Sequence, residues 1–316
     1  MTIVCLGEIL IDRVVSASGE SNDFPGGAPA NVAIALARLG ATVAFTGAVG
    51  SDRHGQSLLT LLNQEGVNCI GVQTMPHPTR IVEVRCTAEG DRAFGGFIGG
   101  STAAFADTRL SAQQLPLALL KSASVLITGT LGMAYQETRE AMQQAASVVK
   151  AQGGRLIIDV NWRPTFWTEP ETALDILLPW LHQADWLKIS ADEAIALFQT
   201  DSIDVLSRKF PAATVLITDG AQGCRHAMAG SGQVPAFQVN SVETTGAGDA
   251  FLAGMVYQLL QQNWQVSATT DFESALIFAN AMGALTTLKP GAIAALPTPQ
   301  ELIAFLQKYT GKDWRV

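Results

Sequence analysis

Short apolar runs bounded by Gly or Asp alternate with helical patterns along most of this 316-residue chain. Such an alternation is what a mainly parallel sheet covered by helices requires, because each buried strand must return through a crossover segment. It predicts an α/β fold in three layers, with a mainly parallel central sheet flanked by helices. The expected strands are 2–6, 43–49, 125–128, 156–159, 186–189 and 215–218. The expected helices are 31–39, 55–65, 136–151, 203–210, 248–261, 275–287 and 300–308.

One region breaks this alternation. Residues 9–15, 81–87 and 92–98 are strand-like without intervening helices, and Ala88-Glu89-Gly90-Asp91 is typical of a hairpin turn. These strands predict a separate small β-sheet.

Length and charge limit the kinds of domain and partner. A chain of 316 residues is near the size at which one hydrophobic core stops growing, which favours one large domain with a small appendage. The net charge of -8 argues against nucleic acid as a partner. No apolar stretch reaches the ~18 residues of a membrane span, and Thr2–Gly7 is strand-like without a charged leader. We therefore expect a cytoplasmic protein that binds neither nucleic acid nor membrane.

The side chains most often used in metal and catalytic sites are scattered here. The four cysteines lack metal-ligand spacing and predict buried, reduced thiols: Cys5, Cys69, Cys86 and Cys224. None of the four histidines lies in a catalytic constellation, so we expect them to serve packing or surface roles.

The segment Gly246-Ala247-Gly248-Asp249 precedes an apolar run and is expected at the start of a buried helix. Its glycines leave unpaired backbone N–H groups exposed where the helix dipole favours an anion. The dipole should also keep the Asp249 carboxylate ionised and reduce its basicity, while leaving it able to accept a proton from a hydroxyl. The alternative interpretation is a tight turn in which Asp249 only caps the helix.

Two separated motifs resemble one known family. Glu243–Phe251 resembles the C-terminal signature of the ribokinase-like (PfkB-type) sugar kinases, and Gly26–Ala33 resembles their N-terminal signature. The similarity extends from about Val4 to Pro297. It implies a single ribokinase-like kinase domain over 1–316, with a lid formed by about 9–24 and 77–100. In this family such a lid covers the sugar site and is often a dimer contact, so the resemblance also implies a homodimer through the lid.

The resemblance assigns roles to the first glycine-rich segment. Asp12, Gly26, Gly27 and Asn31 match positions that bind sugar hydroxyls, together with Asp249. For Asn31 the alternative is a helix N-cap.

The phosphate side is implied by two motifs. Asp159-Val-Asn-Trp-Arg resembles a stretch of fructokinases and ketodeoxygluconate kinases, in which Arg163 would clamp phosphate and Asn161 would reach the phosphate or its metal. A salt-bridged structural role for Arg163 stays open. Lys188-Ile-Ser-Ala-Asp-Glu matches the Asn-x-x-Glu motif of the family with Ser190 in place of Asn, and Glu193 would organise Mg²⁺ through water. For Glu193 the alternative is a first-turn acid favoured by the helix dipole.

The nucleotide would lie against Thr218, Gly220 and Gly223, which resemble the family's Thr-x-Gly-x-x-Gly loop, with Asn280 beside the adenine. No P-loop sequence occurs, and Phe251 stands where a dinucleotide-binding fingerprint needs its third glycine. The family also suggests a K⁺ site, whose requirement here stays open because Glu243 replaces the commoner Asp and Ala295 replaces a Ser. Its oxygens would come from Glu243, Thr245, Thr286, Lys289 and Gly291.

The resemblance implies an ATP- and Mg²⁺-dependent kinase acting on a primary hydroxyl of a small sugar, with fructose favoured. Asp249 would take the hydroxyl proton, and the N–H groups of Gly246, Ala247 and Gly248 would stabilise the transferring phosphoryl group. Aminoimidazole riboside or another nucleoside, and 2-keto-3-deoxygluconate, are alternative substrates. Two other classes stay open: a non-catalytic sugar-binding pseudo-kinase, and a nucleotide-dependent oxidoreductase.

Overall fold

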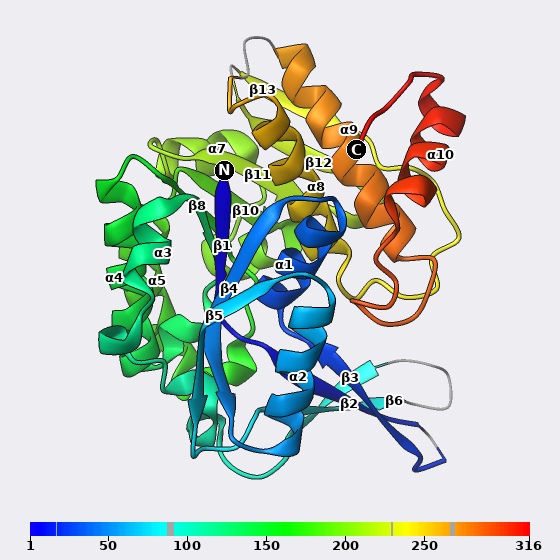
Figure 1. Cartoon of the computed structure of the whole chain (residues 1–316). Coiled ribbons are helices and arrows are strands. Elements are labelled where there is room, and N and C mark those ends of the chain that lie inside the picture. Colours follow the sequence, from blue (N-terminus) through cyan, green and yellow to red (C-terminus); the bar gives the residue numbers. More distant parts are fainter. Residues whose placement is uncertain (17, 87–91, 229, 266–268) are drawn as a thin grey trace.

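The computed structural model of the chain describes residues 1–16, 18–86, 92–228, 230–265 and 269–316. Within these residues a nine-stranded sheet forms the centre, in the order β13-β12-β11-β10-β9-β8-β1-β4-β5 (Figure 1). All neighbours from β11 to β5 pair in parallel, while β12 and β13 continue one edge in antiparallel fashion. The strands are β1 (Thr2–Leu6), β4 (Thr42–Gly50), β5 (Asn68–Met75), β8 (Ala123–Thr128), β9 (Arg155–Asp159), β10 (Trp186–Ser190), β11 (Thr214–Thr218), β12 (Cys224–Ala227) and β13 (Ser231–Val234).

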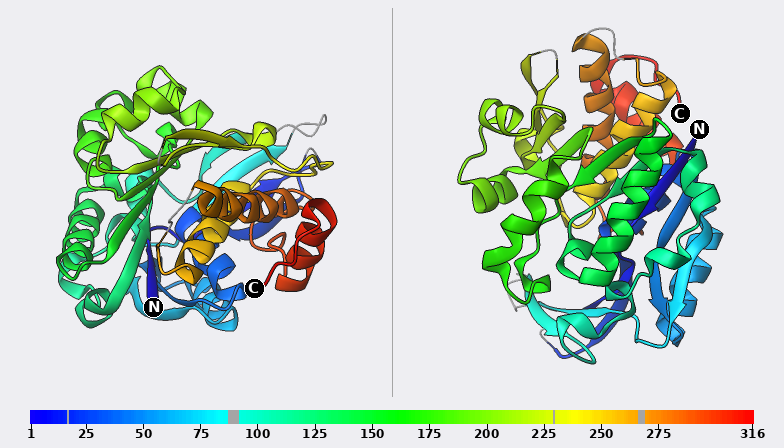
Figure 2. Two further views of the ribbon diagram at one scale, coloured as in Figure 1. Left: turned by 90° about the horizontal axis from the view of Figure 1, so that it is seen from above. Right: turned by 90° about the vertical axis from the view of Figure 1, so that its left-hand side faces the viewer.

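Helices cover both faces of this sheet, as Figure 2 shows. Alternate side chains of β1 enter different cores, with Ile3 and Cys5 on one face and Val4 and Leu6 on the other. The first core is closed by α1 (Ala28–Arg38), α2 (Arg53–Gln64), α8 (Ala247–Gln261), α9 (Thr269–Thr286) and α10 (Pro299–Thr310). The second is closed by α3 (Leu117–Ser122), α4 (Gln136–Ala151), α5 (Ala173–Leu181), α6 (Ala191–Phe198) and α7 (Ile203–Lys209). The predicted three-layer α/β fold is confirmed.

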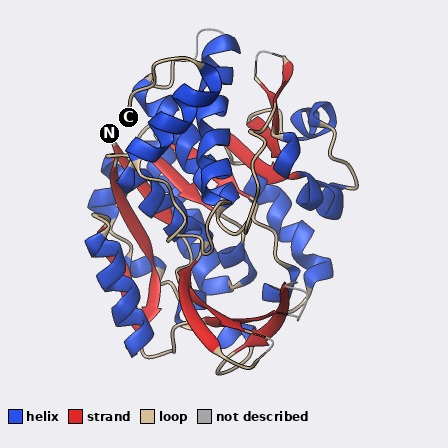
Figure 3. Ribbon diagram, turned by 90° about the vertical axis from the view of Figure 1, so that its right-hand side faces the viewer, coloured by secondary structure: helices blue, strands red, loops and turns tan. Residues whose placement is uncertain are grey.

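A second sheet of four strands lies apart from the central sheet, at the lower edge of the molecule in Figure 3. Its strands are β2 (Leu10–Val15), β3 (Ser21–Gly26), β6 (Ile81–Cys86) and β7 (Arg92–Phe97), in the order β3-β2-β6-β7. We call this sheet the lid. The strand β3 was not predicted, because Pro25 interrupts a strand pattern; an edge strand tolerates it. The expected hairpin turn at Ala88–Asp91 lies outside the described residues.

The other differences from the predicted elements have local causes. Helix α1 begins at Ala28 rather than Asn31, since Pro29 fits the first turn of a helix. Strand β5 was missed because polar and apolar residues are mixed along an edge strand, and α5 because Pro179 lies inside it. Helix α6 spans only 8 residues, too few for a clear helical period.

Cys5, Cys69 and Cys224 are free thiols, and Cys69 is half-buried rather than buried. Within the described ranges, no helix is long and apolar enough to cross a bilayer.

Candidate active site

A cleft of about 970 Å³ lies between the lid and the carboxyl ends of the parallel strands. Its wall is built from the segments that follow β1, β9, β10 and β11, from the lid, and from the start of α8. Gly26, Thr286 and Lys289 do not line it. The remaining predicted site residues all do: Asp12, Gly27, Asn31, Asn161, Arg163, Ser190, Glu193, Thr218, Gly220, Gly223, Glu243, Thr245, Gly246, Ala247, Gly248, Asp249, Asn280 and Gly291.

The start of α8 has the backbone that the glycines predict. Gly246 is the N-cap residue with φ of 80°, a left-handed conformation that favours glycine, and a Cβ there would lie 2.7 Å from the Ala292 Cβ. The Ala247 N–H donates to the Thr244 carbonyl at 3.2 Å, so this predicted phosphate donor is already used by the turn. Gly248 has no side chain, which leaves space beside its backbone. A Cβ added at Gly248 would lie 3.2 Å from the Lys188 Nζ.

Asp249 and Asn31 meet across the interface of α8 with α1. The Asn31 Nδ2 donates to the Asp249 Oδ2 at 2.7 Å. Asn31 is therefore not the N-cap of α1, a position that Gly27 occupies. The Asn31 Oδ1 is buried and has no hydrogen-bond partner in the part of the chain that the structure describes. A buried acceptor without a partner is costly unless a ligand supplies the donor.

The predicted reduction in the basicity of Asp249 is wrong in direction. Burial raises the pKa of Asp249, and it outweighs the hydrogen bond from Asn31 and the charges of Lys188 and Arg163, which lower this pKa. The carboxylate is half-buried in the wall of the cleft, and its loss of solvation disfavours the charged form. A raised pKa makes Asp249 a stronger base than the helix start alone would give.

Two glycines shape the sugar side. Gly27 has φ of 108°, and a Cβ there would lie 2.6 Å from the Glu8 carbonyl oxygen, so only glycine fits. Gly26 ends the lid strand β3, and a Cβ at this position would collide with the Asp12 carboxylate. Gly26 was predicted to contact the sugar, but it does not line the cleft. The absence of a side chain at Gly26 instead leaves room for Asp12.

A buried ion pair lies beside the start of α8. The Lys188 Nζ is 2.9 and 3.0 Å from the two carboxylate oxygens of Asp159, and both residues are buried. Burial raises the pKa of Asp159 to about 6, against the lowering effect of Lys188. Neither residue was predicted to act in the site. The sequence did hold a sign of this ion pair: Lys188 lies within the mostly apolar strand β10, and a buried lysine needs an anionic partner.

Glu193 fixes the loop after β9. Its carboxylate accepts from the Ser190 N–H at 2.9 Å and from the Trp162 N–H at 2.8 Å, and it lies 3.5 Å from the Arg163 guanidinium. The Ser190 hydroxyl in turn accepts from the Glu193 N–H at 3.2 Å, completing a capping box. Asn161, with φ of 41°, is held in a left-handed conformation by this arrangement. Ser190 and Glu193 therefore organise backbone at the cleft.

The far end of the cleft is a glycine loop after β11. Gly220 and Gly223 have φ of 46° and 91°, and the Asp219 N–H donates to the Gly223 carbonyl at 2.8 Å. Asn280 of α9 donates to the carbonyls of Val234 and Pro235 at 3.3 and 3.0 Å. The asparagine thus secures the segment after β13 against the helix that borders this end.

Only some of the residues predicted to bind a monovalent cation lie together at the cleft. The Glu243 Oε2 accepts from the Gly291 N–H at 3.0 Å beside the start of α8. The Thr286 hydroxyl donates to the Met282 carbonyl at 2.9 Å, and Lys289 pairs with Glu301 at 2.9 Å, so both side chains are engaged away from the cleft.

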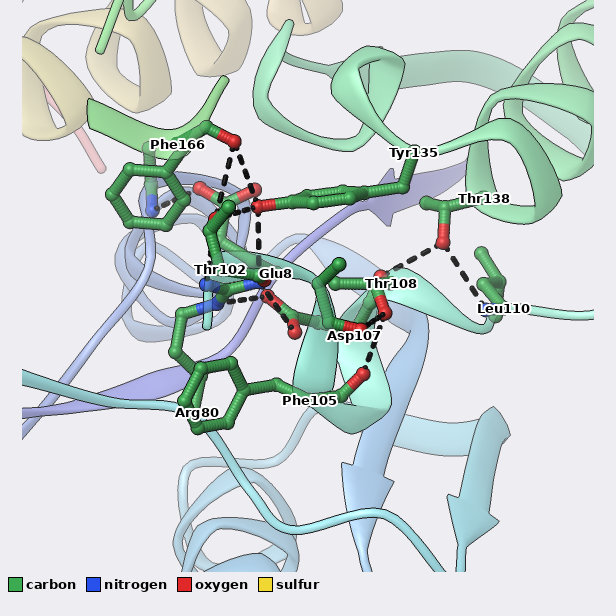
Figure 4. Close-up of polar contacts among 12 residues, drawn as sticks. Glu8, Arg80, Thr102, Phe105, Asp107, Thr108, Leu110, Tyr135, Thr138 and Phe166 are labelled. Atoms are coloured by element: carbon green, nitrogen blue, oxygen red, sulfur yellow. Dashed lines mark hydrogen bonds and ion pairs between the residues drawn. The ribbon is translucent and has the colours of Figure 1, made fainter. Parts of the chain in front are cut away.

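A buried network joins the lid to the body, as Figure 4 shows. Arg80, directly before β6, pairs with Asp107 at 2.7 and 3.0 Å and donates to the Tyr135 hydroxyl at 3.2 Å. The Tyr135 hydroxyl donates to the Phe166 carbonyl at 2.9 Å. The guanidinium lies 4.7–5.5 Å from the ring centroids of Phe97, Phe105, Tyr135 and Phe166.

This network was not predicted, since its members are far apart in the sequence. It connects the lid strands β6 and β7 to the segment that carries Arg163, because Phe166 follows that residue and also lines the cleft. The two walls of the cleft are therefore held by one cluster.

Comparison with known proteins places the chain in one family. Residues 2–299 match the family described as pfkB family carbohydrate kinase. Fructokinase-2 of Zea mays is 37% identical over 318 residues, covering 96% of this chain and 94% of that protein.

Two solved structures are similar over nearly the whole chain. The fructokinase from Xylella fastidiosa with bound ATP is 30% identical, with a TM-score of 0.89 and coverage of 97% of this chain and 98% of that one. The fructokinase from Vibrio cholerae, bound to fructose, ADP and calcium ion, is 31% identical with a TM-score of 0.85, covering 96% and 98% of the two chains. A double mutant of the latter was solved with fructose, ADP and potassium ion.

Proposed function

This chain belongs to the pfkB family of carbohydrate kinases, and we propose that it transfers the γ-phosphoryl group of ATP to a primary hydroxyl of fructose. Relatives that are 30–37% identical over nearly the full length are named fructokinases, and two of them bind ATP or fructose with ADP. The observation that carries the proposal is the Asn31–Asp249 pair, because it joins a buried polar acceptor without a partner among the described residues to a half-buried carboxylate at the start of α8.

Sugar binding is assigned to Asp12, Gly27 and Asn31. The Asp12 carboxylate and the Asn31 Oδ1 accept hydrogen bonds from sugar hydroxyls, and Gly27 lets the ligand approach the backbone. The lid residues Val82, Val84 and Phe94 cover the same side of the cleft and exclude water. Exclusion of water favours transfer to the sugar over hydrolysis of ATP.

Asp249 accepts the proton of the attacking hydroxyl. Its pKa is raised by burial, which improves its basicity, while Asn31 and Lys188 favour the ionised form that a base requires. The start of α8 and the Lys188 ammonium stabilise charge on the transferring group, and Arg163 binds its outer oxygens. Asn161 contributes to phosphate binding on the same side of the cleft as Arg163. Ser190 and Glu193 hold the loop that carries Asn161 in place. Thr218, Gly220, Gly223 and Asn280 border the nucleotide.

Magnesium fits this site as a companion of the nucleotide. Within the described ranges, no group of three His, Cys, Asp or Glu side chains forms a metal cage. Mg²⁺ keeps several waters and is commonly bound through substrate phosphates, so it needs no such cage. Glu193 and Asp159 are the carboxylates on the phosphate side that would hold its waters. When bound, Mg²⁺ neutralises charge on the phosphates.

A monovalent cation is proposed near Glu243 and Gly291, beside the start of α8. Thr245 lines the same part of the cleft, whereas Thr286 and Lys289 would contribute only backbone oxygens. Titration of KCl at constant ionic strength tests this site. Equal turnover in sodium and potassium salts contradicts a K⁺ requirement.

A homodimer through the lid is also proposed. Phe24 and Phe94 of the lid line the cleft and are still 38% and 46% exposed, and a second lid packed over them would bury this apolar surface. Light scattering coupled to gel filtration measures the mass, and Phe94→Ser should shift it towards the monomer. A monomeric wild-type protein at micromolar concentration contradicts this assembly.

The substrate is tested by a coupled assay for ADP release. Fructose, glucose, ribose, aminoimidazole riboside and 2-keto-3-deoxygluconate are compared as relative kcat/KM with ATP and Mg²⁺. The proposal expects fructose to give the highest value. ADP release without any sugar response contradicts a kinase. A much faster riboside or acid sugar contradicts only the fructose assignment.

A further inference from the structure

Glu8 is a buried carboxyl group in the cleft for which the proposed mechanism has no use. It follows β1, whose last residue is Leu6, and lies where ligands of parallel sheets collect. The residue is 6% exposed and lines the cleft. Figure 4 shows it next to the network around Arg80.

The Glu8 side chain has few partners. Its Oε1 accepts from the Ala28 N–H at 3.2 Å, and the carboxyl group also accepts from the backbone N–H of Glu8 itself. Arg80, the cation that lies beside it in Figure 4, is already paired with Asp107. A buried carboxylate without a cation is strongly disfavoured.

The surroundings of Glu8 favour its neutral form. Burial raises the pKa of Glu8 to about 8, against hydrogen bonds from its own backbone N–H and from the Ala28 N–H, which lower this pKa; the charges of Asp107 and Asp249 raise it as well. Asp12 on β2 also lines this part of the cleft. Because Oε1 accepts from Ala28, the proton of neutral Glu8 resides on Oε2.

Apart from Glu8, the side chains assigned to sugar binding mainly offer hydrogen-bond acceptors. Asp12 and Asp249 are carboxylates. Asn31 donates from its Nδ2 to Asp249, and its buried Oδ1 is a further acceptor without a partner among the described residues. A sugar carries oxygen atoms that must accept hydrogen bonds when water is excluded, so the subsite needs a donor. A protonated carboxyl group is such a donor.

We propose that Glu8 is a further sugar-binding residue, which donates a hydrogen bond from its protonated Oε2 to an oxygen of the bound sugar. The inference rests on the proposed function, since it assigns Glu8 to the same subsite. It makes sugar use, but not ATP use, depend on the protonation of Glu8. A residue that only caps α1 through Ala28 would show no such dependence.

The test compares the pH dependence of kcat/KM for fructose, at saturating ATP, in wild type, Glu8→Gln and Glu8→Ala. In wild type, kcat/KM should fall by about tenfold per pH unit above pH 8, because ionisation removes the donor and adds charge beside Asp249. Gln keeps one donor and one acceptor but cannot ionise, so this alkaline fall should vanish whatever the activity at pH 7. Ala loses the donor, and its kcat/KM at pH 7 should fall by roughly tenfold with the KM for ATP unchanged.

Glu83→Gln is the matched control. Glu83 lies on the lid strand β6 between Val82 and Val84, which line the cleft, but it does not line the cleft itself. This variant should retain the wild-type alkaline fall.

Two results overturn the role of Glu8: an unchanged alkaline fall in Glu8→Gln, or wild-type fructose kinetics in Glu8→Ala. If Glu8→Ala does not fold, as thermal melting would show, the profile of Glu8→Gln decides alone. If wild type prefers another sugar, the fructose assignment fails, and the same comparison on the preferred sugar still decides the role of Glu8.

Discussion

At the scale of single residues, the site depends on the bond between Asn31 and Asp249. It places an amide whose oxygen faces the ligand next to the carboxylate that takes the proton. The two residues are 218 positions apart in the sequence and lie on different helices. The packing of α1 on α8 therefore sets the position of the base.

Asp249→Asn tests the base. The amide is isosteric, so the contact with Asn31 can be rebuilt and fructose binding should largely persist. Turnover should fall by at least ~10²-fold, since general-base catalysis commonly contributes 10²–10⁴-fold. Steady-state kinetics and calorimetric binding of fructose separate the two effects.

Asp192→Asn is the control for this change, because Asp192 is exposed in the first turn of α6 and does not line the cleft. It should leave turnover unaltered. Turnover of Asp249→Asn within a few-fold of wild type would exclude Asp249 as the base.

At the scale of elements, the start of α8 combines a left-handed N-cap residue, Gly246, with a second glycine in the first turn, Gly248. Gly248 differs from Gly246 in that it does not require a glycine-only conformation, and a Cβ at this position would meet only the Lys188 side chain, which is assigned to the phosphate side. Substitution here is therefore expected to change the phosphate site more than the fold.

Gly248→Val should lower turnover by at least ~100-fold, comparable to the loss of one donor to a developing anion. Gly248→Ala should have an intermediate effect, because its methyl group blocks less of the amide. Both variants should melt within a few degrees of wild type. Wild-type turnover in the valine variant would mean that no phosphate approaches this helix.

The junction of lid and body depends on the network around Arg80. Tyr135→Phe removes one hydroxyl that contacts Arg80, Thr102 and the Phe166 carbonyl. Loss of these bonds in a buried place should reduce the free energy of unfolding by about 1–3 kcal/mol. Urea denaturation measures this change.

Tyr309→Phe on α10 is the matched control, because this side chain is 46% exposed. It should alter the free energy of unfolding by less than about 0.5 kcal/mol. Equal stability of Tyr135→Phe and Tyr309→Phe would show that the network does not stabilise the junction.

At the scale of the whole molecule, carboxyl groups divide into two sets. Glu8, Asp159 and Asp249 line the cleft, and burial raises the pKa of each. Near the surface, hydrogen bonds lower the pKa of Glu301 to about 2, and Arg13 and Arg38 lower the pKa values of Asp23 and Glu65. The two sets affect stability in opposite pH ranges.

The pH dependence of stability follows from these directions. A carboxyl group with a raised pKa binds its proton more tightly in the folded state, so its contribution is lost as pH rises from its unfolded pKa through its folded one. For Glu8 this window runs from 4.5 to about 8, and for Asp159 from 3.8 to about 6. The groups with lowered pKa values lose their contribution below about pH 4 instead.

The ligand-free protein should therefore have its highest melting temperature near pH 5 and lose several degrees by pH 8. Differential scanning calorimetry measures this curve. Glu8→Gln should flatten it, since the amide cannot ionise. A melting temperature that rises steadily from pH 5 to 8 in wild type would contradict the assigned directions.

Much of the architecture was predictable from local patterns. The strands β1, β8, β9, β10 and β11 and the helices α4 and α8 agree with the predicted ranges within two residues, because each is a long or strongly apolar run. Edge strands β5 and β13 were missed because one side of such a strand lacks a neighbour and its residues need not be apolar.

The sequence by itself determined the fold class and the chemistry of the site, since buried strands, a glycine-rich helix start and Asp249 are local features of the chain. It placed nearly all the candidate residues at one edge of the sheet, because parallel strands end on the same side. Only the tertiary structure decided how these groups affect one another. It brought Glu8 and Asp249 into one cleft, paired Lys188 with Asp159, and placed Gly26 against the Asp12 carboxylate. A pKa depends on desolvation and on charges from distant segments, and neither can be read from the residues beside a carboxylate in the chain.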